Sequence, residues 1–301
     1  MICVESNCKV VERLLPVTDY ALGETLESGQ AFRWRAAGEG WEGVIAGRWV
    51  HLRAVPGGIR AIAMAGDRGG ESGADWEWLD SYLQTGVDWE AVVASFPEDE
   101  PMRAAVAACR GLRLLRQEPW ECLASFILSS TKQIVQIRQI VNLLCERHGS
   151  PVAVPAGHEP AFAFPTAGQL AALDESDLRA CKMGFRAPYL LGTARMVADG
   201  TVDLGRIAEL GPEQAREELL RFPGVGGKIA DCVRLFAYGF QDAFPVDVWV
   251  RKALQQLYFP RRRVSARRIE RFAATHFGER AGYAQQYLFH YMRTRVGRDG
   301  G

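Results

Sequence analysis

The first 65 residues alternate between hydrophobic and polar positions in short runs. Residues 31–35, 41–45 and 48–53 follow this two-residue period, and glycine-rich turns separate them. Because successive side chains of a strand point to opposite faces of a sheet, such runs predict half-buried strands. The sequence therefore predicts an antiparallel meander, followed by a mobile, glycine-rich and acidic loop at residues 66–75.

From Trp76 onward the hydrophobic period becomes helical. Residues 119–148 carry apolar side chains at three- and four-residue steps, which predicts one long helix. Shorter helices are predicted at residues 166–172, 175–181, 187–199, 212–221, 228–238, 248–257, 266–277 and 282–294. The predicted fold class is therefore α+β: a small antiparallel β-rich N-terminal domain at residues 1–112 and a mainly helical body at residues 113–301.

Composition changes this picture only through the distribution of charge. Hydrophobic residues make up 48% and charged residues 24% of the 301 residues, a globular mixture. The 36 basic and 36 acidic residues cancel, which taken alone counts against binding to nucleic acid. However, residues 66–101 hold ten acidic residues and one basic residue, whereas residues 245–301 hold twelve basic and four acidic residues. The charges form either two solvated faces or one surface suited to a polyanion.

The cysteines and the N-terminal residues limit the cellular compartments in which the protein is expected. The seven cysteines include no C-x-x-C pair, which argues against a zinc ribbon or a thioredoxin-like site. The first residues lack both a charged region and a long apolar run, so we expect no secretion signal. No stretch is long enough to span a membrane, and we expect no membrane partner. We therefore expect a cytoplasmic protein if the source is bacterial and a nuclear protein if it is eukaryotic.

Residues 219–232 predict two helices joined by a tight turn, with the sequence PGVGGK at residues 223–228. Glycines allow a partner backbone to approach closely, and the amides that open a helix bind phosphate. A Walker phosphate loop is excluded, because Phe222 occupies its first glycine position and Ile229 follows the lysine. The remaining alternative is a purely structural turn with an exposed Lys228.

A second motif, PVD at residues 245–247, follows the hairpin closely. Asp247 stands where it can cap a helix that begins at Val248. A simple helix cap is the plain alternative for this residue.

The motifs PGVGGK and PVD resemble those of the helix–hairpin–helix DNA glycosylases, and within them the 8-oxoguanine DNA glycosylase/lyases. Residues 28–34 resemble that family's signature strand, residues 111–130 its long helix and following turn, and residues 283–289 its base-pocket helix. The resemblance covers nearly the whole chain. It implies two helical subdomains with the active site in the cleft between them.

The resemblance also implies the chemistry. Such enzymes bind damaged double-stranded DNA and flip the damaged nucleotide out of the duplex. Lys228 takes the role of the nucleophile that attacks the sugar, forms a Schiff base and permits β-elimination. Asp247 orients the site and stabilises positive charge on the sugar. This chemistry needs no cofactor or metal ion.

Four residues carry over to the base pocket. Gln285 and Phe289 lie four positions apart on one predicted helix, where Gln can bond a purine edge and Phe can stack on its ring. Cys232 resembles the opposite wall of the pocket, and Gly29 the residue whose carbonyl accepts the N7 hydrogen of 8-oxoguanine. The alternatives are core packing for Gln285 and Phe289 and a buried helix thiol for Cys232.

The expected DNA contacts combine the hairpin with positions matched by motif. They are Gly224, Val225, Gly226, Gly227, Thr131, Arg186, Trp249 and Arg251. The chain departs from the family where Thr131 begins a Thr-Lys-Gln sequence in place of an Asn-rich wedge. It departs again where Trp249 replaces a histidine that contacts phosphate. An ordinary exposed face is the alternative for Arg186.

Other members of the superfamily carry an iron–sulfur cluster after the catalytic helices. The last cysteine here is Cys232, so we expect no such cluster. We expect a monomer that acts as a bifunctional 8-oxoguanine DNA glycosylase and lyase. The alternatives are a monofunctional alkyl-purine glycosylase of the same fold and a non-catalytic DNA-binding protein.

Overall fold

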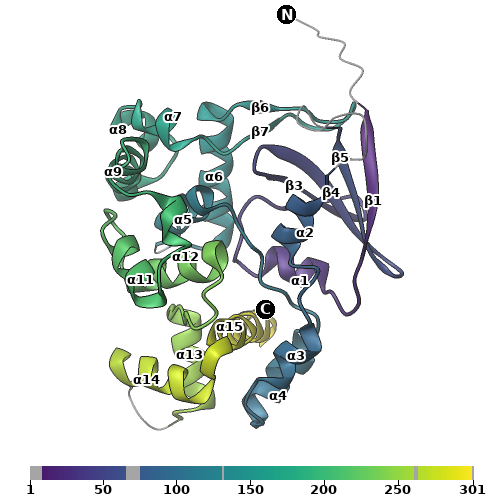
Figure 1. The fold of residues 1–301 in the computed structure, drawn as a ribbon, viewed down its shortest axis with the longest axis vertical. Coiled ribbons are helices and arrows are strands. Elements are labelled where there is room, and N and C mark those ends of the chain that lie inside the picture. The colour runs from purple at the N-terminus through teal and green to yellow at the C-terminus, as the bar shows by residue number, and fades with distance from the viewer. Residues whose placement is uncertain (1–8, 66–74, 131, 261–263, 300–301) are drawn as a thin grey trace, which may run out of the picture.

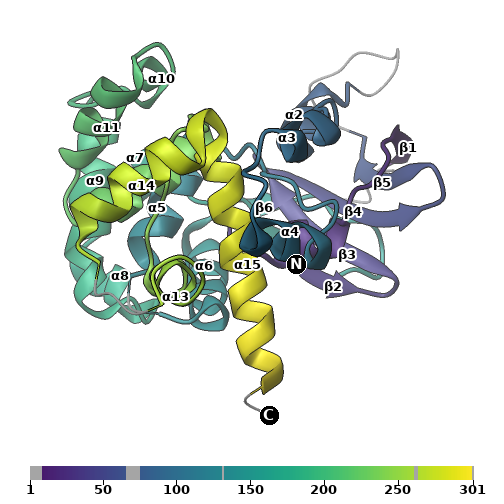
Figure 2. The same ribbon diagram turned by 90° about the horizontal axis from the view of Figure 1, so that it is seen from below.

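The computed structural model describes residues 9–65, 75–130, 132–260 and 264–299. A sheet forms one side of the molecule and a helical body the other, and α15 runs beside the boundary between them (Figures 1 and 2). The predicted α+β fold is thus confirmed. All but the last residue of the predicted loop at residues 66–75 lies outside the described residues, and so does Thr131. No helix in the described ranges has the length and apolar character needed to cross a bilayer.

The N-terminal sheet has five antiparallel strands in the order β1-β5-β4-β3-β2. These are β1 (Val10–Pro16), β2 (Arg35–Ala37), β3 (Gly40–Ile45), β4 (Arg48–Val55) and β5 (Gly58–Met64). One face of the sheet packs on α1 (Leu22–Glu27) and α2 (Glu77–Leu83), around side chains such as Leu26, Trp34 and Leu79. The strands predicted at residues 41–45 and 48–53 are confirmed.

The helices predicted from residue 166 onward are confirmed, mostly to within one or two residues, whereas three short helices at residues 89–94, 100–108 and 204–207 were not predicted. Thirteen α-helices follow α2 in the described residues. They are α3 (Trp89–Ala94), α4 (Glu100–Ala108), α5 (Pro119–Leu128), α6 (Ile134–His148), α7 (Ala167–Ala171), α8 (Glu175–Ala180), α9 (Ala187–Ala198), α10 (Leu204–Ile207), α11 (Pro212–Leu220), α12 (Gly227–Val233), α13 (Val248–Leu257), α14 (Ala266–His276) and α15 (Ala281–Asp299). A π-helical turn, Arg234–Tyr238, continues α12.

The single helix predicted at residues 119–148 is wrong, because the chain breaks it into α5 and α6. The hydroxyls of Ser129 and Ser130 donate to the carbonyls of Phe126 and Ile127, at 2.7 and 3.4 Å. Gln133 then starts α6 with a reciprocal capping box. Short polar side chains that bond the backbone compete with helical hydrogen bonds, and they end α5 here.

The strand expected at residues 28–34 is also wrong. Only residues 35–37 of this region join the sheet, and Gly29 turns the chain with φ +80°. Gln30 is fully buried and fixes the turn to the body. Its amide donates to the carbonyls of Thr25 and Arg113, at 2.9 and 2.8 Å, and accepts from Leu115 N at 2.8 Å.

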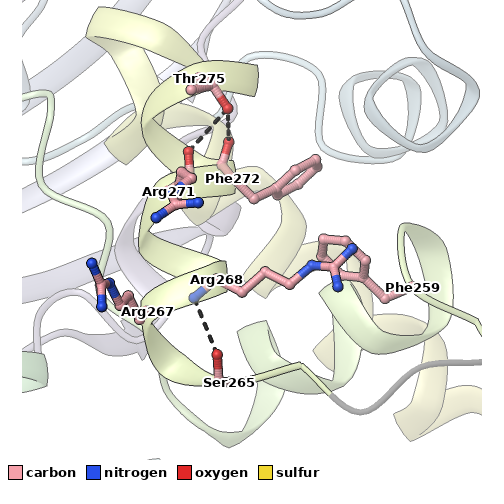
Figure 3. Close-up of a pocket in the computed structure, with 7 residues that line it drawn as sticks. All are labelled: Phe259, Ser265, Arg267, Arg268, Arg271, Phe272 and Thr275. Atoms are coloured by element: carbon pink, nitrogen blue, oxygen red, sulfur yellow. Dashed lines mark hydrogen bonds between the residues drawn. The ribbon is translucent and has the colours of Figure 1, made fainter.

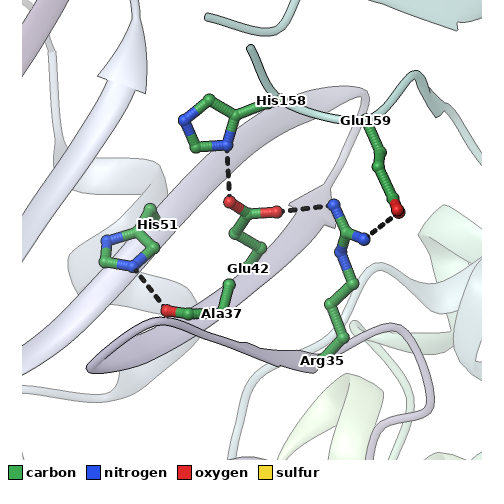
Figure 4. Close-up of polar contacts among 6 residues, drawn as sticks. All are labelled: Arg35, Ala37, Glu42, His51, His158 and Glu159. Carbon is green, nitrogen blue, oxygen red and sulfur yellow. Dashed lines mark hydrogen bonds and ion pairs between the residues drawn. The ribbon is translucent and has the colours of Figure 1, made fainter.

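The connector after α6 ties the body to the sheet (Figure 4). It forms a two-stranded ribbon, β6 (Pro151–Val152) with β7 (Ala161–Phe162). Between the two strands, His158 Nδ1 lies 2.6 Å from the buried carboxylate of Glu42 on β3. Arg35 contacts both Glu42, at 2.7 Å, and Glu159 of the connector. These contacts hold the connector on the sheet.

We expect Gln30→Met to lower the free energy of unfolding by about 2 kcal/mol. The substitution keeps the volume but leaves Arg113 O and Leu115 N without a partner, each worth about 1 kcal/mol or more, whereas Ser28 Oγ still donates to Thr25 O. Urea denaturation measures the change. The control is Gln256→Met, at an exposed position whose side chain has no hydrogen bond to any described residue. A loss below about 1 kcal/mol, or an equal loss in the control, contradicts this account.

Candidate active site

The hairpin between α11 and α12 is shaped by its glycines. Gly224 has φ +75°, and a Cβ there would lie 2.7 Å from the ring of Tyr189. Phe222 and Val225 are buried on either side and anchor the turn. Gly226 caps α12 without a side chain, so no cap competes for the first amides of that helix. An anion can therefore reach these amides.

Lys228 lies in the first turn of α12. Its Nζ is 3.4 Å from Ser129 Oγ and 5.0 Å from the centre of the Phe126 ring. Phe126 stacks in turn on Phe236, with their ring centres 5.6 Å apart. The amine is half-buried at the break between α5 and α6, against an aromatic wall.

Asp247 caps α13, as the sequence predicts, and its Oδ1 accepts from Val250 N at 2.8 Å. Burial raises the pKa of this carboxyl above its ordinary value, although the Val250 amide and the charge of Lys228 oppose the rise. The carboxylate is therefore close enough to Lys228 to feel its charge. A partly desolvated carboxylate interacts strongly with any positive charge that develops beside it.

Cys232 shares this space. Its side chain is buried one turn after Lys228. Burial raises the pKa of the thiol to about 11; Lys228 opposes the rise and Asp247 adds to it. The thiol therefore stays protonated at neutral pH and offers a soft apolar wall rather than a nucleophile.

The predicted pocket helix is α15. Gln285 is 4% exposed, and its Oε1 has no hydrogen-bond partner in the described part of the chain. Phe289, one turn later, is half-buried. A buried acceptor without a partner is costly in a folded protein, so Gln285 has the character of a ligand-reading group.

Gly29 meets this helix although it lies more than 250 residues away in sequence. A Cβ at Gly29 would lie 2.6 Å from Ile134 Cδ1 and 3.4 Å from Arg293 Nη1. Arg293 follows Phe289 by one turn and lies 5.8 Å from its ring centre. The structure thus brings Gly29 to the same end of α15 as Phe289.

The positions expected to contact DNA differ in how exposed their side chains are. Arg251 is exposed on α13, and Trp249 is half-buried with Lys252 Nζ 5.6 Å from its ring. Arg186 is 2% exposed, and its guanidinium donates to Met183 O at 3.3 Å. The exposed face considered for Arg186 is therefore wrong, and a contact with DNA requires this side chain to turn outward.

Two aromatic residues beside the hairpin were not singled out from the sequence. Phe185 is 54% exposed and Tyr189 41% exposed, and their rings meet edge to face at 6.4 Å. Tyr189 also packs under Gly224 of the hairpin. This exposed aromatic pair offers apolar surface beside the hairpin on which a partner can dock. Their four-residue spacing was the available signal.

A depression of about 660 Å³ lies apart from these groups, on α14 (Figure 3). Its lining residues are Phe259, Ser265, Arg267, Arg268, Arg271, Phe272 and Thr275. None of its three arginines pairs with an acidic side chain of the described residues. The described part of the chain contains no group of three or more His, Cys, Asp and Glu side chains placed to hold a metal ion.

Comparison with known proteins agrees with this arrangement. The family model for the N-terminal domain of 8-oxoguanine DNA glycosylase matches residues 14–123. The model for HhH-GPD superfamily base excision DNA repair proteins matches residues 124–277, about half of the chain. Together they span the sheet, the hairpin, Lys228 and Asp247.

Individual relatives extend the match. A protein of Methanothermobacter thermautotrophicus named "Probable N-glycosylase/DNA lyase" is 33% identical over 66% of this chain and 69% of its own length. The structure of MBOgg1 in complex with a low-affinity DNA ligand has a TM-score of 0.87 at 32% identity, covering 97% of this chain and 98% of the other.

The 8-oxoguanine glycosylase/lyase of Clostridium acetobutylicum, solved with double-stranded DNA containing cytosine opposite 8-oxoguanine, has a TM-score of 0.84 at 30% identity. The match covers 94% of this chain and 98% of the other. The chain therefore belongs to the 8-oxoguanine DNA glycosylase family, within the HhH-GPD superfamily of base excision DNA repair proteins.

Proposed function

We propose that the protein is a bifunctional DNA glycosylase and lyase of base excision repair, which excises 8-oxoguanine from duplex DNA with Lys228 as its nucleophile. The observation that carries the proposal is the placement of Lys228: its amine lies at the break between α5 and α6, 3.4 Å from Ser129 Oγ, with the buried Cys232 one turn later on α12. The charge of Lys228 opposes the rise in pKa of both Cys232 and the Asp247 carboxyl that caps α13, so the three groups lie close together. A non-catalytic hairpin protein has no need of this costly arrangement.

Recognition begins with the extrusion of the damaged nucleotide. The backbone amides of Gly226 and Gly227, at the start of α12, donate hydrogen bonds to a backbone phosphate. The extruded base enters between Cys232 and Phe289, where the unpartnered Oε1 of Gln285 accepts from its Watson–Crick edge. The carbonyl of Gly29 accepts the N7 hydrogen, which 8-oxoguanine has and guanine lacks.

Lys228 then carries out the covalent step. Its ammonium group first gives up a proton, and the amine then forms a bond to C1′ as the C1′–N9 bond breaks. The departing base keeps the electron pair and takes up that proton. Opening of the sugar ring gives an imine between Nζ and C1′. The imine acidifies the C2′ proton, and its loss expels the 3′ phosphate by β-elimination.

Asp247 acts on the charge that this step creates. Positive charge develops on the sugar as the base departs, and the carboxylate stabilises it in a desolvated setting where electrostatic interactions are strong. Its bond to Val250 N holds the carboxylate in place. The same carboxylate therefore caps α13 and stabilises the developing charge.

The partner is damaged double-stranded DNA, and the basic segment at residues 245–301 supports this. The unpaired arginines of α14 and the exposed Arg251 and Lys252 of α13 supply positive charge on the helices that follow Asp247. Each phosphate that they neutralise adds affinity that falls with added salt.

The first prediction concerns borohydride trapping on a duplex with 8-oxoguanine opposite cytosine. Reduction of the imine fixes the protein to the DNA, so the wild-type chain gives a covalent adduct on a denaturing gel. Lys228→Gln gives none. The matched control is Lys9→Gln, which removes an exposed lysine just before β1 and keeps the adduct. An adduct that persists in Lys228→Gln contradicts the role of Lys228.

Excision of 3-methyladenine without excision of 8-oxoguanine favours the alkyl-purine alternative.

The second prediction separates the charge of Asp247 from its cap. Asn caps a helix about as well as Asp, so Asp247→Asn keeps the cap and removes the charge. Single-turnover excision falls by about 100-fold or more, as for the loss of one electrostatic stabiliser. Burial raises the pKa of Asp247 in the folded state, so the protonated carboxyl is the form that stabilises the fold. This contribution to the free energy of unfolding is lost as pH rises through the raised pKa. At pH 7 the Asn variant therefore unfolds at the same temperature or higher.

The pH profile gives the corresponding check. Wild-type excision falls as pH drops through the raised pKa of Asp247, above the ordinary aspartate value of about 3.9. The Asn variant lacks this acidic limb. If Asp247→Asn loses activity and stability in parallel and its pH profile keeps the acidic limb, Asp247 serves only as a helix cap.

A further inference from the structure

The turn around Gly29 has a pattern of hydrogen bonds that singles out one carbonyl. Arg293 Nη2 donates to Glu27 O at 2.7 Å, Gln286 Nε2 to Ser28 O at 3.2 Å, and Gln117 Nε2 to Gln30 O at 2.7 Å. The carbonyl of Gly29 accepts no hydrogen bond from any described residue. Side chains thus hold the carbonyls on both sides of Gly29 and leave its own acceptor available.

Two of the three donors belong to α15. Gln286 and Arg293 are seven residues apart, which is two helical turns, so both reach the same segment of the turn. The same helix carries Gln285 and Phe289. The acceptor of Gly29 and the pocket's reading and stacking groups are therefore positioned against one rigid element.

Arg293 is the residue that contacts both parts. Its guanidinium lies 5.8 Å from the ring centre of Phe289, and its Nη1 lies 3.4 Å from the point where a Cβ on Gly29 would stand. It is half-buried, unlike Arg295, which is exposed on the same helix and donates to Tyr291 Oη at 2.8 Å. A planar guanidinium can stack and donate at once, which an ammonium group does less well.

We propose that Arg293, assisted by Gln286, is a positioning residue for lesion specificity: it sets the distance between the Gly29 carbonyl and the stacking face of Phe289. This inference rests on the proposed function. Discrimination of 8-oxoguanine from guanine by one hydrogen bond requires the acceptor to lie within a few tenths of an ångström of its place, because hydrogen bonds weaken steeply with distance and angle.

The test measures binding selectivity in a Lys228→Gln background, where no excision occurs. The probes are two duplexes that differ only in 8-oxoguanine or guanine opposite cytosine. Arg293→Leu, which retains an apolar stem, is expected to weaken binding of the damaged duplex by about fivefold to tenfold, the value of one hydrogen bond. Binding of the undamaged duplex changes much less.

Three further variants complete the test. Arg295→Leu removes an exposed cation from the same helix and leaves the selectivity unchanged. Arg293→Lys keeps a donor and a charge and restores part of the selectivity. Gln286→Leu frees the Ser28 carbonyl and lowers selectivity in the same direction, and it serves as the test if Arg293→Leu does not fold.

The outcomes separate this inference from the proposed function. Equal loss for both duplexes in Arg293→Leu, or no loss in a folded protein, overturns the role of Arg293. A Lys228→Gln parent that binds both duplexes equally contradicts the proposed function itself. A selective parent with an unaffected Arg293→Leu contradicts only the positioning role.

Discussion

The contact on which the proposed base pocket depends is the docking of residues 27–30 onto α15. One side of this contact comes from the sheet domain and the other from the C-terminal helix. Gln30 is fully buried at the joint and satisfies backbone groups of both Thr25 and Arg113. Gln286 and Arg293 hold the adjacent carbonyls. The positive φ at Gly29 permits the turn that all of these bonds require.

At the proposed catalytic groups, the cost of burying charge is set against its effect on the reaction. Burial raises the pKa of Asp247 and of the Cys232 thiol, so the site carries a carboxylate in surroundings that disfavour its charge. The cap to Val250 and the nearby Lys228 offset part of that cost. The same desolvation strengthens the attraction between the carboxylate and a developing positive charge. Burial of Asp247 thus costs stability at the point where the proposed mechanism needs charge stabilisation.

Local sequence patterns were sufficient to predict the hairpin and the helices that follow it. Glycine in the turn, Asp247 as a cap and the four-residue spacing of Gln285 and Phe289 all follow from conformational preference and helical period. The break after α5 escaped the periodicity, because apolar positions continue across it while Ser129 and Ser130 bond back to the backbone. The turn at residues 28–34 has an alternating pattern but pairs with α15 rather than with the sheet. The bond from Arg293 to Glu27 spans 266 residues, and no local pattern reveals such a contact.

A crystal structure of Lys228→Gln bound to a duplex with 8-oxoguanine opposite cytosine tests the central claim most directly. The account predicts an extruded base between Cys232 and Phe289. Its N7 lies within about 3.2 Å of the Gly29 carbonyl, the usual limit for such a bond. The bonds from Gln286 and Arg293 to the flanking carbonyls remain in place. A base seated elsewhere, or a Gly29 carbonyl that does not contact N7, contradicts the account.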